Sequence, residues 1–238
     1  MYNEFAKKHY KGKHPCTTKS LYNEKKLIGR LHQYFLIYFE TFSVPTADTL
    51  FLLILSILTL ESAHSIRFLY QHFLSGITEK SLNVFYYAKV DYSRFMNTTA
   101  RIALKLIPDS LQIQPVFLCV DDTMVSKFGT KFENVSKLFD HAAHNGSNYL
   151  NGHCFVSVML CVPVWNRDKV SYLSVPLGYR MWQKKESKLE LAASMIQQVM
   201  PEFHNKDHVI ILCDSWYTKQ NLVSIVDEYP NLDLIFSL

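Results

Sequence analysis

The spacing of apolar residues changes near residue 112, and this change constrains the fold more than any other feature of the sequence. Before it, apolar residues recur with a period close to 3.6, which is the spacing of an amphipathic helix. After it come continuous apolar runs rich in β-branched residues, typical of strands that are buried on both faces. We therefore expect two domains in the 238 residues, a helical one over 1–112 and a mixed one over 113–238.

Helix-breaking residues divide the first part. The pattern predicts helices over 20–42, from about 46 to 60, over 62–74, near 78–81 and over 92–107, with Pro45, Gly76 and Pro108 as breaks. The most apolar stretch, 50–60, is too short to cross a bilayer, which takes about 20 residues. The five cysteines are odd in number and widely spaced, which favours free thiols in a reducing compartment. We therefore expect a soluble, cytoplasmic protein without a membrane segment.

Positive charge is concentrated at the N-terminus. Residues 1–44 carry eight Lys and Arg against three Glu, whereas the whole chain has a net charge of +4. A basic arm on a nearly neutral body suits a polyanion such as DNA. The alternative is a solvated terminus without a partner.

The second part follows the order β-β-β-α-β-α-β. Strands are expected over 115–121, 153–164, 172–179, 208–213 and 232–236, and helices over 188–200 and 217–228. Three consecutive strands followed by alternating helices and strands resemble the ribonuclease-H-like fold, a mixed sheet flanked by helices. The predicted fold class is therefore mixed α/β, with an N-terminal helical domain before a partial ribonuclease-H-like sheet.

Acidic residues follow two of the apolar strands. The first strand leads into Asp121 and Asp122, and the fourth leads into Asp214. Ligands collect at the carboxyl ends of strands in an open α/β sheet. Two carboxylates there can hold a hard divalent cation through oxygen ligands. The alternative for Asp214 is helix capping, since Asp is favoured immediately before a helix.

From about Pro115 to the end, the sequence resembles the catalytic domain of an insertion-sequence DDE transposase. The similar segments are 121–123 (DDT), 127–131 (KFGTK), 151–153 (NGH), 162–165 (VPVW) and 213–217 (CDSWY). The resemblance implies an enzyme that cuts and rejoins DNA ends with two Mg²⁺ or Mn²⁺ ions held by Asp, Asp and Glu. It also implies double-stranded DNA as the partner, both transposon ends and target, and allows a homo-oligomer.

Carried over to this chain, the resemblance makes Asp214 the second acid. It favours Asp122 as the first, because that acid directly precedes Thr123. Strand alternation puts Asp121 and Asp122 on opposite faces of the strand. Because both faces are expected to be buried, the pattern alone does not decide which of the two is the first acid. The candidate DNA contacts near the two acids are Lys127, Lys131, Lys137 and Trp216. For the three lysines, the alternative is an ordinary solvated loop.

The third acid has no evident counterpart. In the resembling transposases this Glu lies well beyond the fifth strand, whereas the present chain stops at Leu238. Asp227 and Glu228 lie at the far end of a helix, on the order of 18 Å from the strand end at 1.5 Å rise per residue. We therefore expect an incomplete transposase that is inactive alone. If the chain does cut DNA, the acids to test are Glu133, Asp140 and Glu186.

Two other functions remain open. One is a non-catalytic DNA-binding or regulatory protein that occupies transposon ends, and the other is a ribonuclease-H-like nuclease that hydrolyses without joining. A zinc site is a weaker alternative to ordinary loop residues, because its His-x-x-His spacing is loose for a structural site. Its members would be His141, His144, His153 and Cys154.

Overall fold

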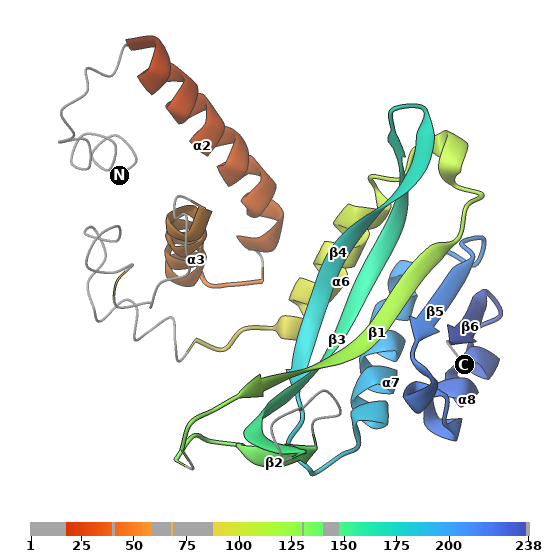
Figure 1. The fold of residues 1–238 in the computed structure, drawn as a ribbon. Coiled ribbons are helices and arrows are strands. Elements are labelled where there is room, and N and C mark those ends of the chain that lie inside the picture. The colour runs from red at the N-terminus through yellow and green to blue at the C-terminus, as the bar shows by residue number, and fades with distance from the viewer. Residues whose placement is uncertain are drawn as a thin grey trace. The chain divides into compact units, whose positions relative to one another are not determined.

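A computed structural model of the protein describes residues 18–39, 41–58, 68, 88–129, 131–139 and 148–236. The chain divides into two compact units, Met1–Asp91 and Tyr92–Leu238 (Figure 1). The division precedes the change of periodicity at residue 112, because the helix that starts at Tyr92 packs against the sheet of the second unit. Periodicity marks where helices give way to strands, whereas the unit boundary depends on what each helix packs against.

The first unit contains helices α2 (Thr18–Phe39) and α3 (Val44–Leu58). Phe51 of α3 is 1% exposed and meets the rings of His32 and Phe35 edge-on, with centroids 5.2 and 5.4 Å apart. Pro45 does not break this helix but lies in its first turn, where the missing N–H has no intrahelical partner to lose. The helices predicted over 62–74 and 78–81, and most of the basic arm, lie outside the described residues. No described helix is long and apolar enough to span a membrane.

The described part of the second unit is built on a six-stranded mixed sheet. Its strands are β1 (Val116–Ser126), β2 (Ser136–Phe139), β3 (Tyr149–Asn166), β4 (Lys169–Met181), β5 (Val209–Cys213) and β6 (Leu232–Phe236). In Figure 1, β3 and β4 form a long hairpin on one side of β1, with β5 and β6 on the other. β1 and β4 run antiparallel to β3, while β5 and β6 run parallel to β1. The strand order β4-β3-β1-β5-β6 confirms the predicted ribonuclease-H-like fold class.

Within the described residues, three helices accompany this sheet: α6 (Tyr92–Leu104), α7 (Lys188–Val199) and α8 (Gln220–Glu228). Short 3-10 turns lie at Asp109–Leu111 (η1), Met200–Glu202 (η2) and Ser215–Tyr217 (η3). The helix predicted over 217–228 is therefore two elements, η3 and α8. β2, which the sequence analysis did not predict, is a four-residue strand paired with the start of β3.

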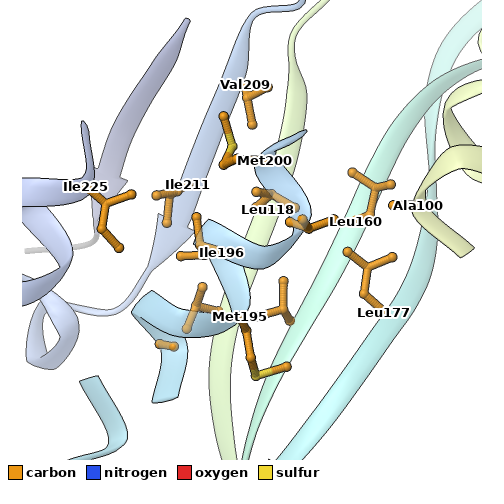
Figure 2. Close-up of a cluster of buried hydrophobic side chains, with 14 of the residues drawn as sticks. Ala100, Leu118, Leu160, Leu177, Met195, Ile196, Met200, Val209, Ile211 and Ile225 are labelled. Atoms are coloured by element: carbon orange, nitrogen blue, oxygen red, sulfur yellow. The ribbon is translucent and has the colours of Figure 1, made fainter. Parts of the chain in front are cut away.

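The hydrophobic core lies between the sheet and these helices. Alternate residues of β1 face it, and Leu118 meets β3 and α7 side chains there (Figure 2). Leu118 and Leu160 are fully buried, and burying one such leucine stabilises the fold by about 1.5–3 kcal/mol. This core fixes α7 over the middle of the sheet, and so fixes what its first residue can reach.

Candidate active site

Asp121 and Asp122 lie inside β1, not at its end as the sequence analysis predicted. The parallel pairing of β1 with β5 stops at Cys119 and Leu212, but β1 remains paired with β3 as far as Ser126. The strand therefore continues through the acids because β3 is long enough to supply hydrogen bonds beyond the end of β5. The two acids lie in a part of β1 that projects beyond β5.

The pleat of β1 separates these two acids. Asp122 lies on the face that carries Leu118 and Val120, toward the helices, while Asp121 points to the opposite face and is exposed. A carboxylate oxygen of Asp121 accepts a hydrogen bond from the main-chain N–H of Asp122 at 2.8 Å. The expectation that both faces of this strand are buried was wrong, since Cys119 on the second face is only half-buried.

The carboxylate of Asp122 is enclosed by three donors. Lys188 Nζ lies 2.7 Å from Oδ2, the Cys154 thiol donates to Oδ2 at 3.3 Å, and the Tyr217 hydroxyl donates to Oδ1 at 3.0 Å. The side chains of Lys188 and Asp122 are 21% and 19% exposed. We call these four residues the Asp122 cluster. It contains one ammonium and one carboxylate, so its formal charge is zero.

Local structure brings each donor to Asp122. Ser187 and Glu190 form a capping box that starts α7 at Lys188, and Lys188 lies on the same helical stripe as buried Ala192 and Met195. Cys154 projects from the core face of β3, and Tyr217, in η3, is fully buried. The cluster therefore joins β1, β3, α7 and the segment after β5.

Burial acts on the pKa of every group in this cluster, and for Asp122 and Lys188 the ion pair and hydrogen bonds together outweigh it. Burial alone would raise the pKa of Asp122, but the Lys188 ammonium and the hydrogen bonds from Cys154 and Tyr217 hold it below its ordinary value. Burial alone would lower the pKa of Lys188, but Asp122 outweighs it and raises that pKa. Burial is the main cause that raises the pKa of Cys154 to about 11 and also raises that of Tyr217. At neutral pH the thiol and the phenol are therefore protonated donors.

Asp214 has different surroundings. It follows β5, is exposed, and its Oδ1 accepts the main-chain N–H of Trp216 at 3.0 Å, which caps η3. The capping interpretation thus describes its present contact. Tyr217 connects the two acids, because its N–H donates to the main-chain oxygen of Asp214 at 3.1 Å while its hydroxyl reaches Asp122.

Two of the lysines predicted to contact DNA lie over aromatic rings. Lys127 Nζ is 5.7 Å from the ring centroid of Phe132, and Lys137 Nζ is 4.7 Å from that of Tyr149. Lys131 is exposed. Trp216 is 44% exposed. Its ring centroid lies 5.3 Å from Lys188 Nζ and 5.5 Å from Lys219 Nζ.

Gly152, in the NGH segment, permits a close approach of two strands. It pairs with Ser126 of β1 and with Ser136 of β2. A Cβ at this position would collide with the main-chain oxygen of Val125. Only glycine fits here without moving the backbone of β1.

Sequence reasoning missed Lys188 and Tyr217. One signal for Lys188 was present, because a lysine four residues before Ala192 falls on the apolar stripe of its helix. The stripe does not reveal that β1 lies opposite. The sequence pattern predicts Tyr217 as the start of a helix, and its contact with Asp122 joins residues far apart in the chain.

Among the residues that the structure describes, no third acidic ligand joins Asp122 and Asp214. Glu228 accepts hydrogen bonds from Gln197 on α7, at 3.2 and 3.0 Å, and Glu186 is exposed before that helix. His153 Nε2 lies 2.8 Å from the main-chain oxygen of Glu133, while Cys154 belongs to the Asp122 cluster. Asp140, His141 and His144 lie outside the described residues. Within the described ranges, no group of three His, Cys, Asp or Glu is placed to hold a metal ion.

A divalent cation therefore does not fit this site as the described side chains are arranged. Both oxygens of Asp122 accept hydrogen bonds from protein donors, and its charge is already balanced by Lys188. Asp214 offers an exposed carboxylate, but two acids without a third leave a two-ion centre short of ligands.

Comparisons with known proteins found only remote similarity. No protein-family model matches the chain, and no curated protein matches it. Two solved structures of Mos1 transposase do: a strand transfer complex and a paired-end complex with the left transposon end. Each is 12% identical, has a TM-score of 0.25, and covers 76% of this chain. The chain spans 56% of each Mos1 chain, so little more than half of their length is represented.

Proposed function

We propose that this chain is a transposase-type DNA-processing protein of the DDE class, whose second unit supplies the first two acids of a strand-cleavage and strand-transfer site. The observation that carries the proposal is the position of Asp122 and Asp214. They follow the paired segments of two parallel central strands in a ribonuclease-H-like sheet, and Tyr217 contacts both. In this fold class, ligands are expected at such strand ends. The sequence segments around both acids resemble the same family.

A basic and aromatic segment that follows the first acid along the chain supports DNA as the partner. The segment from the end of β1 to the start of β3 carries Lys127, Lys131 and Lys137 interleaved with exposed aromatic rings. Those rings belong to Phe128, Phe132, Phe139 and Tyr149, which are 95%, 53%, 43% and 52% exposed. Lysines that contact phosphates, combined with rings on which bases stack, are typical of nucleic-acid-binding surfaces.

DNA binding by the full chain tests this proposal. We expect fluorescence anisotropy to show binding of duplex DNA taken from either side of the coding sequence, weakening steeply between about 50 and 200 mM salt through counterion release. Replacing Lys131 and Lys137 together by Gln should weaken binding and reduce the salt slope. The matched control replaces Lys169, at the start of β4, and Lys184, between β4 and α7; both are exposed, and this variant should bind as the wild type does. Absence of binding, or equal binding at both salt concentrations, contradicts the proposal.

The Asp122 cluster favours a second candidate, a non-catalytic regulator that occupies the same DNA. Because Lys188 already balances Asp122 and no three-ligand group lies among the described residues, we expect no nicking of supercoiled plasmid by this chain with Mg²⁺ or Mn²⁺. Nicking that disappears in Asp214→Ala would instead identify an enzyme active on its own. The third ligand would then be sought by substituting Glu133, Asp140 and Glu186.

A further inference from the structure

The Lys188 ammonium lies beside Asp122, where a cation bound to that carboxylate would lie. Its Nζ is 2.7 Å from Oδ2, and the pair is about four-fifths buried on both sides. Such a pair interacts far more strongly than an exposed ion pair, because water screens it less. The cluster therefore needs no added ion to balance the charge of Asp122.

The position of Lys188 is fixed by the fold. The capping box of Ser187 and Glu190 sets it as the first residue of α7, and Ala192 and Met195, both buried, orient the same face of the helix toward the sheet. A cation at a helix N-terminus is disfavoured by the helix dipole. Its partner Asp122 offsets that effect, and the pKa values of both groups are shifted in the directions that keep them charged.

A divalent cation on Asp122 would compete with this ammonium. It would need the carboxylate oxygens that Lys188, Cys154 and Tyr217 now occupy, and it would stand beside a like charge. The ring of Trp216 provides another place for the ammonium, since its centroid is already 5.3 Å from Lys188 Nζ. A lysine over an indole face gains a cation–π attraction that partly compensates for the lost ion pair.

We infer that Lys188 is the resident counter-ion of Asp122, and that a divalent cation binds this carboxylate only by displacing it toward Trp216. Lys188 is thus a positioning residue that limits metal loading at the site. The inference rests on the proposed function only in assigning metal binding to Asp122. With Lys188 in this place, Asp122 keeps the position expected of a metal-binding acid while its oxygens are occupied by protein donors.

Mn²⁺ binding to the full chain tests the inference without DNA. The free Mn²⁺ signal in electron paramagnetic resonance, titrated with protein, gives the dissociation constant. We expect Lys188→Met to bind Mn²⁺ at least about tenfold more tightly than the wild type, because a competing charge is removed. Lys188→Arg should retain the weak binding of the wild type. Lys185→Met, the same change at an exposed lysine three positions earlier, should leave the affinity unchanged.

Two further variants keep the result interpretable. Because Lys188→Met also removes the partner of a buried acid, circular dichroism must show it folded, and Lys188→Gln serves if it is not. The gain in affinity should vanish in the double variant Asp122→Asn with Lys188→Met. A gain that persists there, or no gain in either Lys188 variant, overturns the inference, because the ion then binds elsewhere or without competition.

A fluorescence measurement follows the displaced ammonium. Adding Mg²⁺ to the wild type should change indole emission, and this change should be absent from Lys188→Met and from Trp216→Phe. A change that survives in Lys188→Met contradicts movement of the ammonium onto Trp216. Failure of the proposed function would be seen separately as loss of salt-dependent DNA binding, which neither metal measurement involves.

Discussion

Asp122 and Asp214 each come after an apolar run of a strand, but their surroundings differ. Asp122 lies within β1, is largely buried, and accepts hydrogen bonds from three side chains contributed by three other segments. Asp214 lies just after β5, is exposed, and accepts a main-chain hydrogen bond from two residues ahead. One carboxylate is part of the tertiary structure and the other is a local cap. The same sequence signal, an acid after an apolar run, thus marks a location in the sheet without defining the chemistry there.

The largest expected effect is the loss of stability when Asp122 in β1 is replaced. Asp122→Ala leaves the buried ammonium of Lys188 unpaired and removes the acceptor of Tyr217. We expect the free energy of unfolding, measured with urea, to fall by about 3 kcal/mol. The adjacent Asp121→Ala, on the exposed face of the same strand, should cost less than about 0.5 kcal/mol. Equal losses in the two variants would show that the Asp122 cluster does not stabilise the fold.

A second effect tests why β1 can extend past β5 at all. Gly152→Ala places a Cβ against the main-chain oxygen of Val125, so β1 and β3 must separate locally. The expected loss of stability is roughly 2 kcal/mol, as for other overpacked sites. Gly29→Ala is the control, because that helical glycine has open space around its Cβ position and alanine is the better helix former. A Gly152→Ala protein as stable as the wild type would show that the strands can part without cost.

The sequence predicted β1, β3 and β5 well because each contains a continuous apolar run rich in β-branched residues. It predicted the wrong end for β1, since nothing in Asp121-Asp122-Thr123 announces that β3 continues to pair beyond β5. The acids of the candidate site were found from the strands they follow. Lys188 was not, because its role depends on which strand faces the first turn of α7. Local pattern thus identifies elements, whereas the end of a strand such as β1 and a contact such as Lys188 with Asp122 are fixed by packing.

A smaller loss of stability is expected when Asp214, the acid that follows β5, is replaced. Asp214→Ala removes the oxygen that accepts the Trp216 N–H at 3.0 Å, so η3 loses its cap. Loss of such a cap costs about 0.5–1 kcal/mol, which should appear as a modest drop in the urea midpoint with an unchanged slope. Asp214→Asn or Asp214→Ser should recover most of it, because both side chains can accept the same hydrogen bond. A loss as large as that of Asp122→Ala would mean that Asp214 also belongs to a buried network.

The last and smallest expected effect is on the pH dependence of stability, compared between the wild type and Asp122→Asn. The pKa of Asp122 is lowered in the folded protein from its ordinary value of 3.8, so its charge stabilises the fold above that value and ceases to do so as pH falls through the folded pKa. The pKa of Lys188 is raised from 10.5, so its contribution is complete below that value and disappears only as pH rises through the folded pKa. The difference in unfolding free energy between the two proteins should therefore be constant from about pH 5 to 9 and shrink below about pH 4. The difference in unfolding free energy between Asp122→Asn and the double variant Asp122→Asn with Lys188→Met should not change below about pH 4. A wild-type advantage that persists undiminished at about pH 3 would show that the Asp122 charge contributes nothing, and that its side chain acts only as a neutral acceptor.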